Sequence, residues 1–492
     1  MGCSSTNVKE EPKKIFVQKN ENRENKENKE KEILIPKYPY GFIGPLNRGE
    51  GYYYPDNMIN TNNKKKKNNI NQINQVNQSD NISHLNQSSF DKELCKSIAS
   101  KLPKRTQIDF QALKNLMRTK TNNLSQKEKS FVIFLWICDN ISYDAKSYFS
   151  NDDVDCTPEG VYRNGVTVCS GYSRLFKNFS DYLGLEVLCV KCYAKGVSYE
   201  QGQRPEKQTH HEYNVIKLNN RWYPIDSTWG AGHINDEKFV KCYDEYYFLA
   251  DPETLINTHF PEDEKWQLTK RRYTLEEFLS WPKVYSYFYG YKFERYFPKE
   301  GLIELNNTNQ QKFIIYGKDM NNKSALCSVY LLQGNIYQTI ENAHNINFYE
   351  DRFEVDCIFN KRGKYKVNIF GSNVKGNHES HKILVEYVVM VENDSIQQLS
   401  FPKFYNGKED LNIIEPLYNN LRTGQKVKFK IKTSLEQIVI TDGDEWLYLK
   451  KNEQGYFEKE FVIQSQPGQT VEIGKKNPNA NNYLFLVCYN VV

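Results

Sequence analysis

Three short segments, Cys169-Ser-Gly-Tyr-Ser173, His211-Glu-Tyr-Asn-Val215 and Asp226-Ser-Thr-Trp-Gly230, say most about the chemistry of this chain. They present a cysteine, a histidine and an aspartate in that order, which are the parts of a thiol nucleophile, its base and the group that orients the base. Cys169 stands just before an apolar pattern with helical spacing. At the start of a helix, the helix dipole and the free N–H groups favour a thiolate and can receive an oxyanion. The segments therefore predict a catalytic centre built on Cys169, His211 and Asp226.

A predicted hairpin selects His211 over its neighbour His210. Two short strands flank Asn219-Asn220, a hairpin turn signal. If these two asparagines form the turn, Tyr213 faces Asp226 across the hairpin. His211 then lies on the same sheet face as Asp226, as a diagonal neighbour within reach of a hydrogen bond, whereas His210 points to the other face.

Each of these residue types also has a plainer interpretation. A buried cysteine is usually an inert small hydrophobe, and a histidine on a strand is more often a satisfied core residue than a base. The helix-start cysteine and the hairpin geometry, taken together, favour the catalytic interpretation.

Metal and redox motifs are weak in this chain. Cys189 and Cys192 form its only CxxC, but their odd spacing puts them on opposite faces of a strand, so we interpret them as core thiols. The acidic run Asp152-Asp-Val-Asp155 lacks the glycine and glutamate spacing of an EF-hand. We therefore expect no metal ion and no cofactor.

Length and composition narrow the class of protein. A chain of 492 residues is too long for one core and predicts three or more folded units. The net charge of +5 reflects 66 basic against 61 acidic residues, a near-balance that argues against nucleic-acid binding. The sequence has no apolar run of about 18 residues, so we expect no transmembrane helix. We also expect no signal peptide. The eleven cysteines are accordingly expected to be reduced thiols in the cytosol.

The character of the sequence changes along the chain. The first part is rich in Lys, Glu and Asn and cannot bury enough apolar area to offset chain entropy. The middle part mixes helical patterns with strands, and Ser125-Gln-Lys-Glu128 is a capping box that opens one of its helices. The last part alternates apolar and polar residues between Gly and Asn turns, as β-sandwiches do. We expect a disordered tail at 1–89, an α+β catalytic core at 90–298 and two Ig-like β-sandwich domains at 299–397 and 398–492.

The amino terminus predicts a lipid anchor. Met1-Gly-Cys-Ser-Ser-Thr6 fits the N-myristoylation pattern with Gly2 as the acceptor, and Cys3 beside it is a candidate for palmitoylation. One myristoyl chain binds membranes only marginally, so the second chain matters for stable anchoring. The alternative is a chance Met-Gly start. We expect a cytoplasmic protein that is associated with a membrane through this end.

The segments around Cys169, His211 and Asp226 resemble the transglutaminase-like superfamily and, within it, the kyphoscoliosis peptidase family. The resemblance covers about residues 91–298. Further matching segments are Trp136–Asp144, Phe248–Pro252, His259–Pro261 and Trp266–Leu268. The chain departs from the family at Thr167, where a glycine is often found, and at Tyr213, where a tryptophan is often found. Thr167 is expected to crowd the approach to the oxyanion.

The resemblance implies a papain-like core in which Cys169 attacks an acyl carbon, His211 moves the proton and Asp226 orients the imidazole. The acyl-enzyme then passes to water or to an amine. The leading hypothesis is a membrane-tethered cysteine peptidase or amidase that acts on protein substrates. The alternatives are a cytoskeletal or membrane-proximal scaffold with a silent triad, and a protein-glutamine amine transferase that cross-links proteins.

Overall fold

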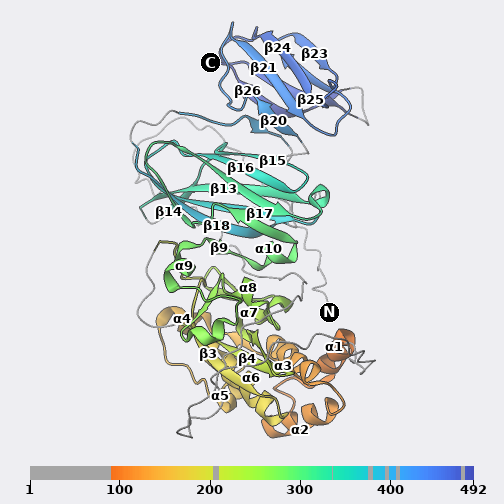
Figure 1. Cartoon of the computed structure of the whole chain (residues 1–492), viewed down its shortest axis with the longest axis vertical. Helices are drawn as coiled ribbons and strands as arrows, with labels where there is room; N and C mark the ends of the chain where they lie inside the picture. Colours follow the sequence, from red (N-terminus) through yellow and green to blue (C-terminus); the bar gives the residue numbers. More distant parts are fainter. Residues whose placement is uncertain are drawn as a thin grey trace, which may run out of the picture.

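The chain folds into units that follow one another along the long axis of the molecule (Figure 1). In the computed structural model, an α+β unit is followed by one β-sandwich and then by a second, as the predicted fold class requires. The described residues are 90–202, 210–334, 336–374, 381–393, 398–405, 411–477 and 482–492. The expected tail, with Gly2 and Cys3, lies outside them.

The α+β unit is built on an antiparallel sheet of strand order β5-β4-β3-β8. The sheet strands are β3 (Val187–Ala194), β4 (His211–Leu218), β5 (Arg221–Ile225) and β8 (His259–Pro261). The longer helices are α1 (Lys92–Lys101), α2 (Phe110–Lys120), α3 (Gln126–Asn140) and α6 (Cys169–Tyr182). The shorter elements are β1 (Ser142–Tyr143), α4 (Ala145–Ser150), α5 (Pro158–Asn164), β2 (Val166–Thr167), α7 (Ser227–Ala231), β6 (Gly232–Asn235), β7 (Lys238–Lys241), η1 (Glu245–Tyr247), α8 (Pro252–Leu255), η2 (Glu264–Gln267), α9 (Leu275–Ser280) and α10 (Ser286–Gly290).

Helices α3 and α6 fill the centre of this unit and contact each other. The predicted capping box opens α3, where Ser125 and Glu128 each accept a hydrogen bond from the other's backbone N–H. Helix α6 starts at Cys169 and buries the aromatic and leucine side chains of one face. It ends before Gly184, whose φ of 75° gives the left-handed conformation expected of a helix stop.

The β4–β5 hairpin has the predicted register. Leu218 pairs with Arg221, and Val215 pairs with Pro224. Asn219 and Asn220 form the turn with φ angles of 48° and 60°. Positive φ at both central residues defines a type I′ turn, whose twist matches that of the strands. The turn therefore fixes which residues of β4 lie opposite the end of β5.

The first β-sandwich has two sheets, ordered β10-β12-β16-β15 and β11-β18-β17-β13-β14. This is the arrangement of an Ig-like domain, and Tyr365 supplies its tyrosine corner by donating to the Lys361 carbonyl at 2.8 Å. The strands are β10 (Phe293–Phe297), β11 (Leu302–Leu305), β12 (Gln310–Gly317), β13 (Ser324–Gln333), β14 (Ile336–Thr339), β15 (His344–Phe348), β16 (Arg352–Ile358), β17 (Gly363–Ser372) and β18 (Lys382–Val391), and the 3-10 helix η3 (Met320–Asn322) precedes β13.

The first β-sandwich and the α+β unit share one hydrophobic core. Strand β9 (Lys283–Val284) pairs with β18, and β10 pairs with β12, so strands of the sandwich begin before residue 298. A continuous cluster of buried apolar residues runs from Cys95 to Val391. The junction between these two units is therefore a packed interface.

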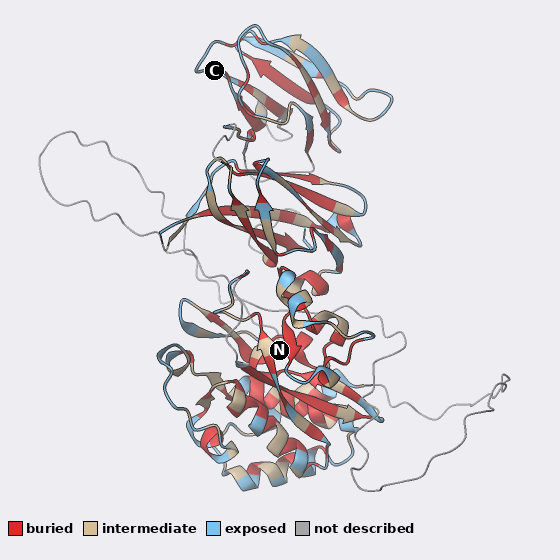
Figure 2. Cartoon of the chain, turned by 60° about the vertical axis from the view of Figure 1, so that its left-hand side comes forward, coloured by how far each residue is buried: buried red, intermediate tan, exposed pale blue. Residues whose placement is uncertain are grey.

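The second β-sandwich has a core of its own, formed between Leu411 and Val491. Figure 2 shows the buried residues of both sandwiches between their facing sheets. The strands of the second β-sandwich are β19 (Lys403–Phe404), β20 (Asn412–Glu415), β21 (Lys426–Lys432), β22 (Ile438–Asp442), β23 (Glu445–Leu449), β24 (Phe457–Val462), β25 (Thr470–Lys476) and β26 (Tyr483–Asn490). Among the described residues, no helix has the length and hydrophobicity needed to cross a membrane.

Candidate active site

Cys169 is the first residue of α6 and is 8% exposed. The preceding residue, Val168, gives the helix no side-chain cap. The first hydrogen bond of the helix start runs from the Gly171 N–H to the Val168 carbonyl at 3.0 Å. The N–H groups of Cys169 and Ser170 precede that bond, so they are the amides that the helix itself does not use. The thiol thus stands beside two donors and the positive end of a helix.

Polar contacts hold α6 against β4. The Ser173 hydroxyl donates to the buried Glu212 carboxylate. The Asn214 side chain donates to the Ser173 carbonyl at 3.0 Å. Because Ser173 lies one helical turn after Cys169, these contacts fix the start of α6 relative to the strand that begins with His211.

The carboxylate of Asp226 is the anchor of the site. It is 2% exposed and follows β5 directly. Its Oδ1 accepts the backbone N–H groups of Thr228 at 2.8 Å and Trp229 at 3.0 Å, which caps α7. Its Oδ2 lies 2.7 Å from His211 Nε2. The predicted diagonal contact between His211 and Asp226 is therefore present.

Cys169 lies close enough to His211 to raise the pKa of the imidazole. Since Asp226 occupies Nε2 of His211, the nitrogen that is left for the thiol is Nδ1. The structure thus brings together the three residues that the sequence singled out. In this order, thiol, imidazole and carboxylate can share and move a proton along one line.

A second histidine, His259, contacts the same carboxylate. Its Nε2 lies 3.0 Å from Asp226 Oδ2, and its Nδ1 lies 2.9 Å from the Thr258 hydroxyl. It comes from β8, and its ring centre is 4.5 Å from that of Trp229. The alternation of faces along the β4–β5 hairpin does not single out His259, because His259 lies on β8, in a distant part of the chain. Its one sequence signal is the His259–Pro261 segment of the family resemblance.

The charges of these three groups follow from burial and pairing. Burial opposes a charge on His211, but Asp226 and Cys169 outweigh it and raise the pKa of His211 above its ordinary 6.5. Burial likewise opposes a charge on Asp226, but the two histidines hold the pKa of its carboxyl well below the ordinary value. Burial lowers the pKa of His259 to about 4. His259 is therefore a neutral donor near pH 7, and His211 carries the proton.

His211, Asp226 and His259 are also a possible set of metal ligands, since one ligand atom of each lies within 4.8 Å of the others. Tetrahedral zinc with ligands near 2.0–2.1 Å keeps those ligands roughly 3.3 Å apart. The two nitrogens lie 2.7 Å and 3.0 Å from the same carboxylate oxygen, which are hydrogen-bond distances. The arrangement therefore fits a hydrogen-bonded cluster, and the residues do not fit a zinc ion as they stand.

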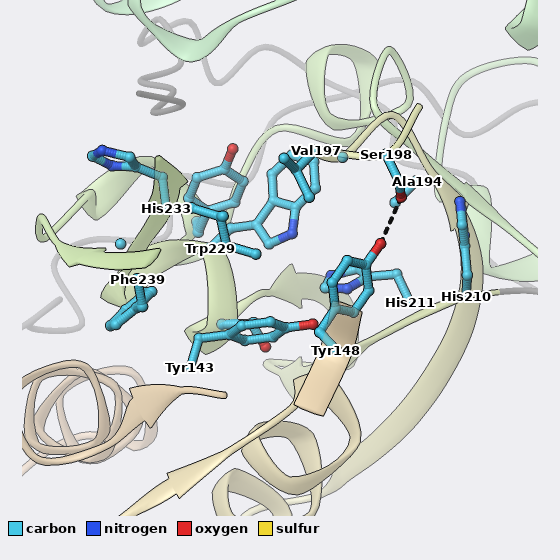
Figure 3. A pocket seen from close by; sticks show the side chains of 15 residues that line it. Tyr143, Tyr148, Ala194, Val197, Ser198, His210, His211, Trp229, His233 and Phe239 are labelled. Atoms are coloured by element: carbon cyan, nitrogen blue, oxygen red, sulfur yellow. Dashed lines mark hydrogen bonds between the residues drawn. The ribbon is translucent and has the colours of Figure 1, made fainter. Parts of the chain in front are cut away.

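An aromatic cavity of about 80 Å³ opens beside His211. Figure 3 shows Trp229 and Tyr143 in its wall, and the hydrogen bond between the lining residues Tyr148 and Ser198 close to His211. That bond joins the Tyr148 hydroxyl of α4 to the Ser198 hydroxyl at 2.6 Å. The described lining contains no carboxylate. The aromatic lining residues are Tyr143, Tyr148, Trp229, Phe239 and Tyr247.

Thr167 does not line this cavity, and neither does Cys169, so the expectation that Thr167 crowds the oxyanion approach stays a prediction. The Thr167 side chain is fully buried against Gly171. A Cβ added at Gly171 would lie 2.0 Å from Thr167 Oγ1. The helix start therefore has room for a threonine at position 167 because residue 171 has no side chain.

Of the two CxxC residues, Cys192 pairs with His211 across β3 and β4 and so lies beside this centre. Cys192 is buried and Cys189 is exposed, as expected for opposite faces of β3. Gly2 and Cys3 lie outside the described residues.

The site geometry and its sheet define a class of protein: a papain-like core with a cysteine at a helix start. Residues 111–227 match the family model of the transglutaminase-like superfamily. The unit that holds Cys169, His211 and Asp226 is therefore transglutaminase-like, and the chain as a whole is similar to kyphoscoliosis peptidases.

Two kyphoscoliosis peptidases are similar to most of this chain, and hillarin is similar to a third of it. Kyphoscoliosis peptidase of Mus musculus is 23% identical over 80% of this chain and 60% of its own length. The Homo sapiens protein is 24% identical over 74% of this chain and 56% of its own. Hillarin of Drosophila melanogaster is 31% identical over 33% of this chain and 21% of its own. The chain thus spans less than two thirds of the length of these relatives.

The contact between Thr167 and Gly171 can be tested by exchange. Gly171→Ala places a methyl group on the buried threonine side chain, so we expect the free energy of unfolding to fall by about 1–3 kcal/mol. Thr167→Gly in the same chain removes the obstacle and should recover most of the loss, measured by urea unfolding. Thr167→Ala should recover less, because Thr167 Cβ is itself only 2.8 Å from the added Cβ. A Gly171→Ala protein as stable as the wild type would contradict this packing.

Proposed function

We propose that this chain is a cysteine-dependent acyl-transfer enzyme that acts on protein substrates as a peptidase or amidase. One arrangement carries the proposal: a cysteine at an uncapped helix start, beside an imidazole whose other nitrogen is held by a buried, ionised carboxylate. This is the division of roles in a Cys-His-Asp triad. Cys169 is the nucleophile, His211 the acid and base, and Asp226 the orienting group.

In the proposed reaction, the Cys169 thiolate attacks the acyl carbon and forms a C–S bond while the carbonyl electron pair moves to oxygen. The N–H groups of Cys169 and Ser170 receive this oxyanion. His211 gives its Nδ1 proton to the leaving amine as the C–N bond breaks, which leaves a thioester. His211 then takes a proton from water, which attacks the thioester and releases the acid. The thiolate and the imidazolium are restored.

His259 has a supporting role in this proposal. Neutral imidazole donates one N–H, and here the Thr258 hydroxyl occupies the other nitrogen. His259 therefore holds Asp226 Oδ2 in place and keeps the carboxylate ionised without competing for the proton on His211.

Amine transfer is the second candidate, because the thioester can pass to an amine in place of water. The aromatic wall of the cavity favours it, since aromatic faces attract an ammonium group. A silent scaffold is the third candidate. It is favoured by the low exposure of Cys169 and by the bond between the lining residues Tyr148 and Ser198.

We further propose that the chain is tethered to the cytoplasmic face of a membrane. The support is the amino-terminal sequence with Gly2 and Cys3, which offers two sites for acyl chains. A protein substrate or a cytoskeletal partner near that membrane fits both the enzyme and the scaffold proposals.

The first test is thiol labelling. A thiol-directed acyl probe should label the wild-type protein at Cys169 and leave Cys169→Ala unlabelled. His211→Ala should slow labelling by roughly 10²-fold or more, because the thiolate loses its proton acceptor. The measurement is the labelling rate by intact-protein mass spectrometry.

Cys488→Ala is the matched control, since Cys488 is a buried cysteine of the second β-sandwich, far from the site, and should not change the rate. A folded wild-type protein that does not react would favour the scaffold. Incorporation of a fluorescent amine into a glutamine donor protein would favour amine transfer over hydrolysis.

The second test is the pH dependence of labelling. Although burial opposes it, Asp226 raises the pKa of His211, so the imidazolium should persist, and labelling should stay rapid, as the pH rises past 6.5. Asp226→Asn removes the charge that raises this pKa. The step of the labelling profile that belongs to His211 should therefore move to lower pH in this variant. Two identical pH profiles would count against the ion pair.

The third test concerns the membrane. Gly2→Ala should move the protein from the membrane to the soluble fraction, because it removes the myristoyl acceptor. Cys3→Ser should leave weaker, salt-independent binding through a single chain. Cell fractionation with blotting is the measurement, and an unchanged membrane fraction for Gly2→Ala would exclude this tether.

A further inference from the structure

One loop serves both the cavity and the first β-sandwich. Residues 195–202 follow β3, and three of them, Gly196, Val197 and Ser198, line the cavity. Ser198 also takes part in the hydrogen bond with Tyr148, another lining residue. The other side of the loop faces the segment that leads into the sandwich. Any movement of that segment must therefore reach the cavity wall or break the contacts between them.

Two buried lysines tie the loop to that segment in a reciprocal way. Lys195 Nζ, from the loop, donates to the Trp281 carbonyl at 2.6 Å. Lys283 Nζ, from β9, donates to the Gly196 carbonyl at 2.6 Å. Their side chains belong to residues that are 0% and 3% exposed. We name this pair of hydrogen bonds the lysine clasp.

Burying the two lysine side chains of the lysine clasp is energetically unfavourable. Burial lowers the pKa of both amines. The pKa of Lys283 falls to about 7. The pKa of Lys195, which lies near Lys283, falls well below its ordinary value. Glu386 of β18 pairs directly with Lys283 across the strands and opposes this effect, while Lys366 of β17 reinforces it. Apolar side chains would fill the space at lower cost. The lysines are therefore best explained by the specific carbonyls that they bind.

Other contacts support the same link. The Gln201 side chain donates to the Leu279 carbonyl at 2.7 Å. Lys364 of β17 lies 3.3 Å from Glu200 at the surface. The backbone N–H of Lys195 donates to the Thr258 carbonyl at 2.9 Å, next to His259 of the site. The loop is thus held between the sandwich on one side and the residues of the active site on the other.

We propose that the first β-sandwich sets the opening of the active-site cavity through the lysine clasp, so that Lys195 and Lys283 are positioning residues for the reaction at Cys169. This rests on the proposed function, because it assigns control of a reactive thiol. A ligand or a mechanical force on the sandwich that displaces β9 relative to β3 also displaces residues 196–198.

Lys283→Met in the full chain tests the proposal, because methionine keeps the length and apolar bulk of the side chain and removes its donors. Hydrogen exchange in residues 195–202 should accelerate by up to roughly tenfold, the loss expected for one buried hydrogen bond. Alkylation of Cys169 should accelerate more for a bulky maleimide than for iodoacetamide. General destabilisation would raise both alkylation rates alike, so the ratio isolates the cavity opening.

Lys323→Met is the matched control. Lys323 is another buried lysine near the base of the sandwich, and it donates to the Tyr291 carbonyl and to the Asn373 side chain, away from the loop. It should change neither the exchange of residues 195–202 nor the ratio of alkylation rates. If Lys283→Met does not fold, Glu386→Gln removes the charge opposite Lys283 at constant volume and should give a smaller change in the same direction.

Unchanged exchange in the loop would overturn the lysine clasp. Faster exchange with an unchanged ratio of alkylation rates would show that the sandwich holds the loop but does not set the opening, which also overturns the proposal. If Cys169 of the wild type reacts no faster than an ordinary thiol, the proposed enzyme fails, and the exchange result still decides whether the sandwich holds the loop.

Discussion

The site depends on the hydrogen bonds and charge partners of one buried carboxylate, that of Asp226. An ionised group in the interior is strongly destabilising unless it is paired and hydrogen-bonded. Asp226 meets this requirement with two backbone N–H groups on one oxygen and two imidazoles on the other. These partners come from α7, β4 and β8, so one electrostatic demand brings three separate segments to a single point. The position of His211, and through it the setting of Cys169, follows from that demand.

Local rules were enough to predict much of this arrangement. The capping box of α3, the start of α6 and the turn at Asn219-Asn220 each depend on residues that are close in the chain. The turn then fixes the register of β4 and β5, and a period of two selects His211 over its neighbour. Motif resemblance added the superfamily. These are short-range constraints, which a single sequence displays directly.

Other features arise from contacts between distant parts of the chain and could not be predicted in this way. His259 reaches Asp226 because β8 pairs with β3, and no local pattern announces that pairing. The buried Thr167 side chain fits at the helix start only because Gly171, four residues later, has no side chain. Lys195 and Lys283 are both buried, although nothing in their local sequence indicates it. In each case the meaning of a residue depends on a partner that only the fold supplies.

The shared hydrophobic core also bears on how such a chain can change over evolutionary time. The α+β unit and the first β-sandwich bury one continuous cluster, whereas the second sandwich has a separate one. A recombination event at residue 298 would part β10 from β12 and expose part of that cluster. The terminal sandwich, in contrast, can be exchanged, duplicated or lost without opening the core around Asp226. Modularity in this architecture therefore begins after the first sandwich.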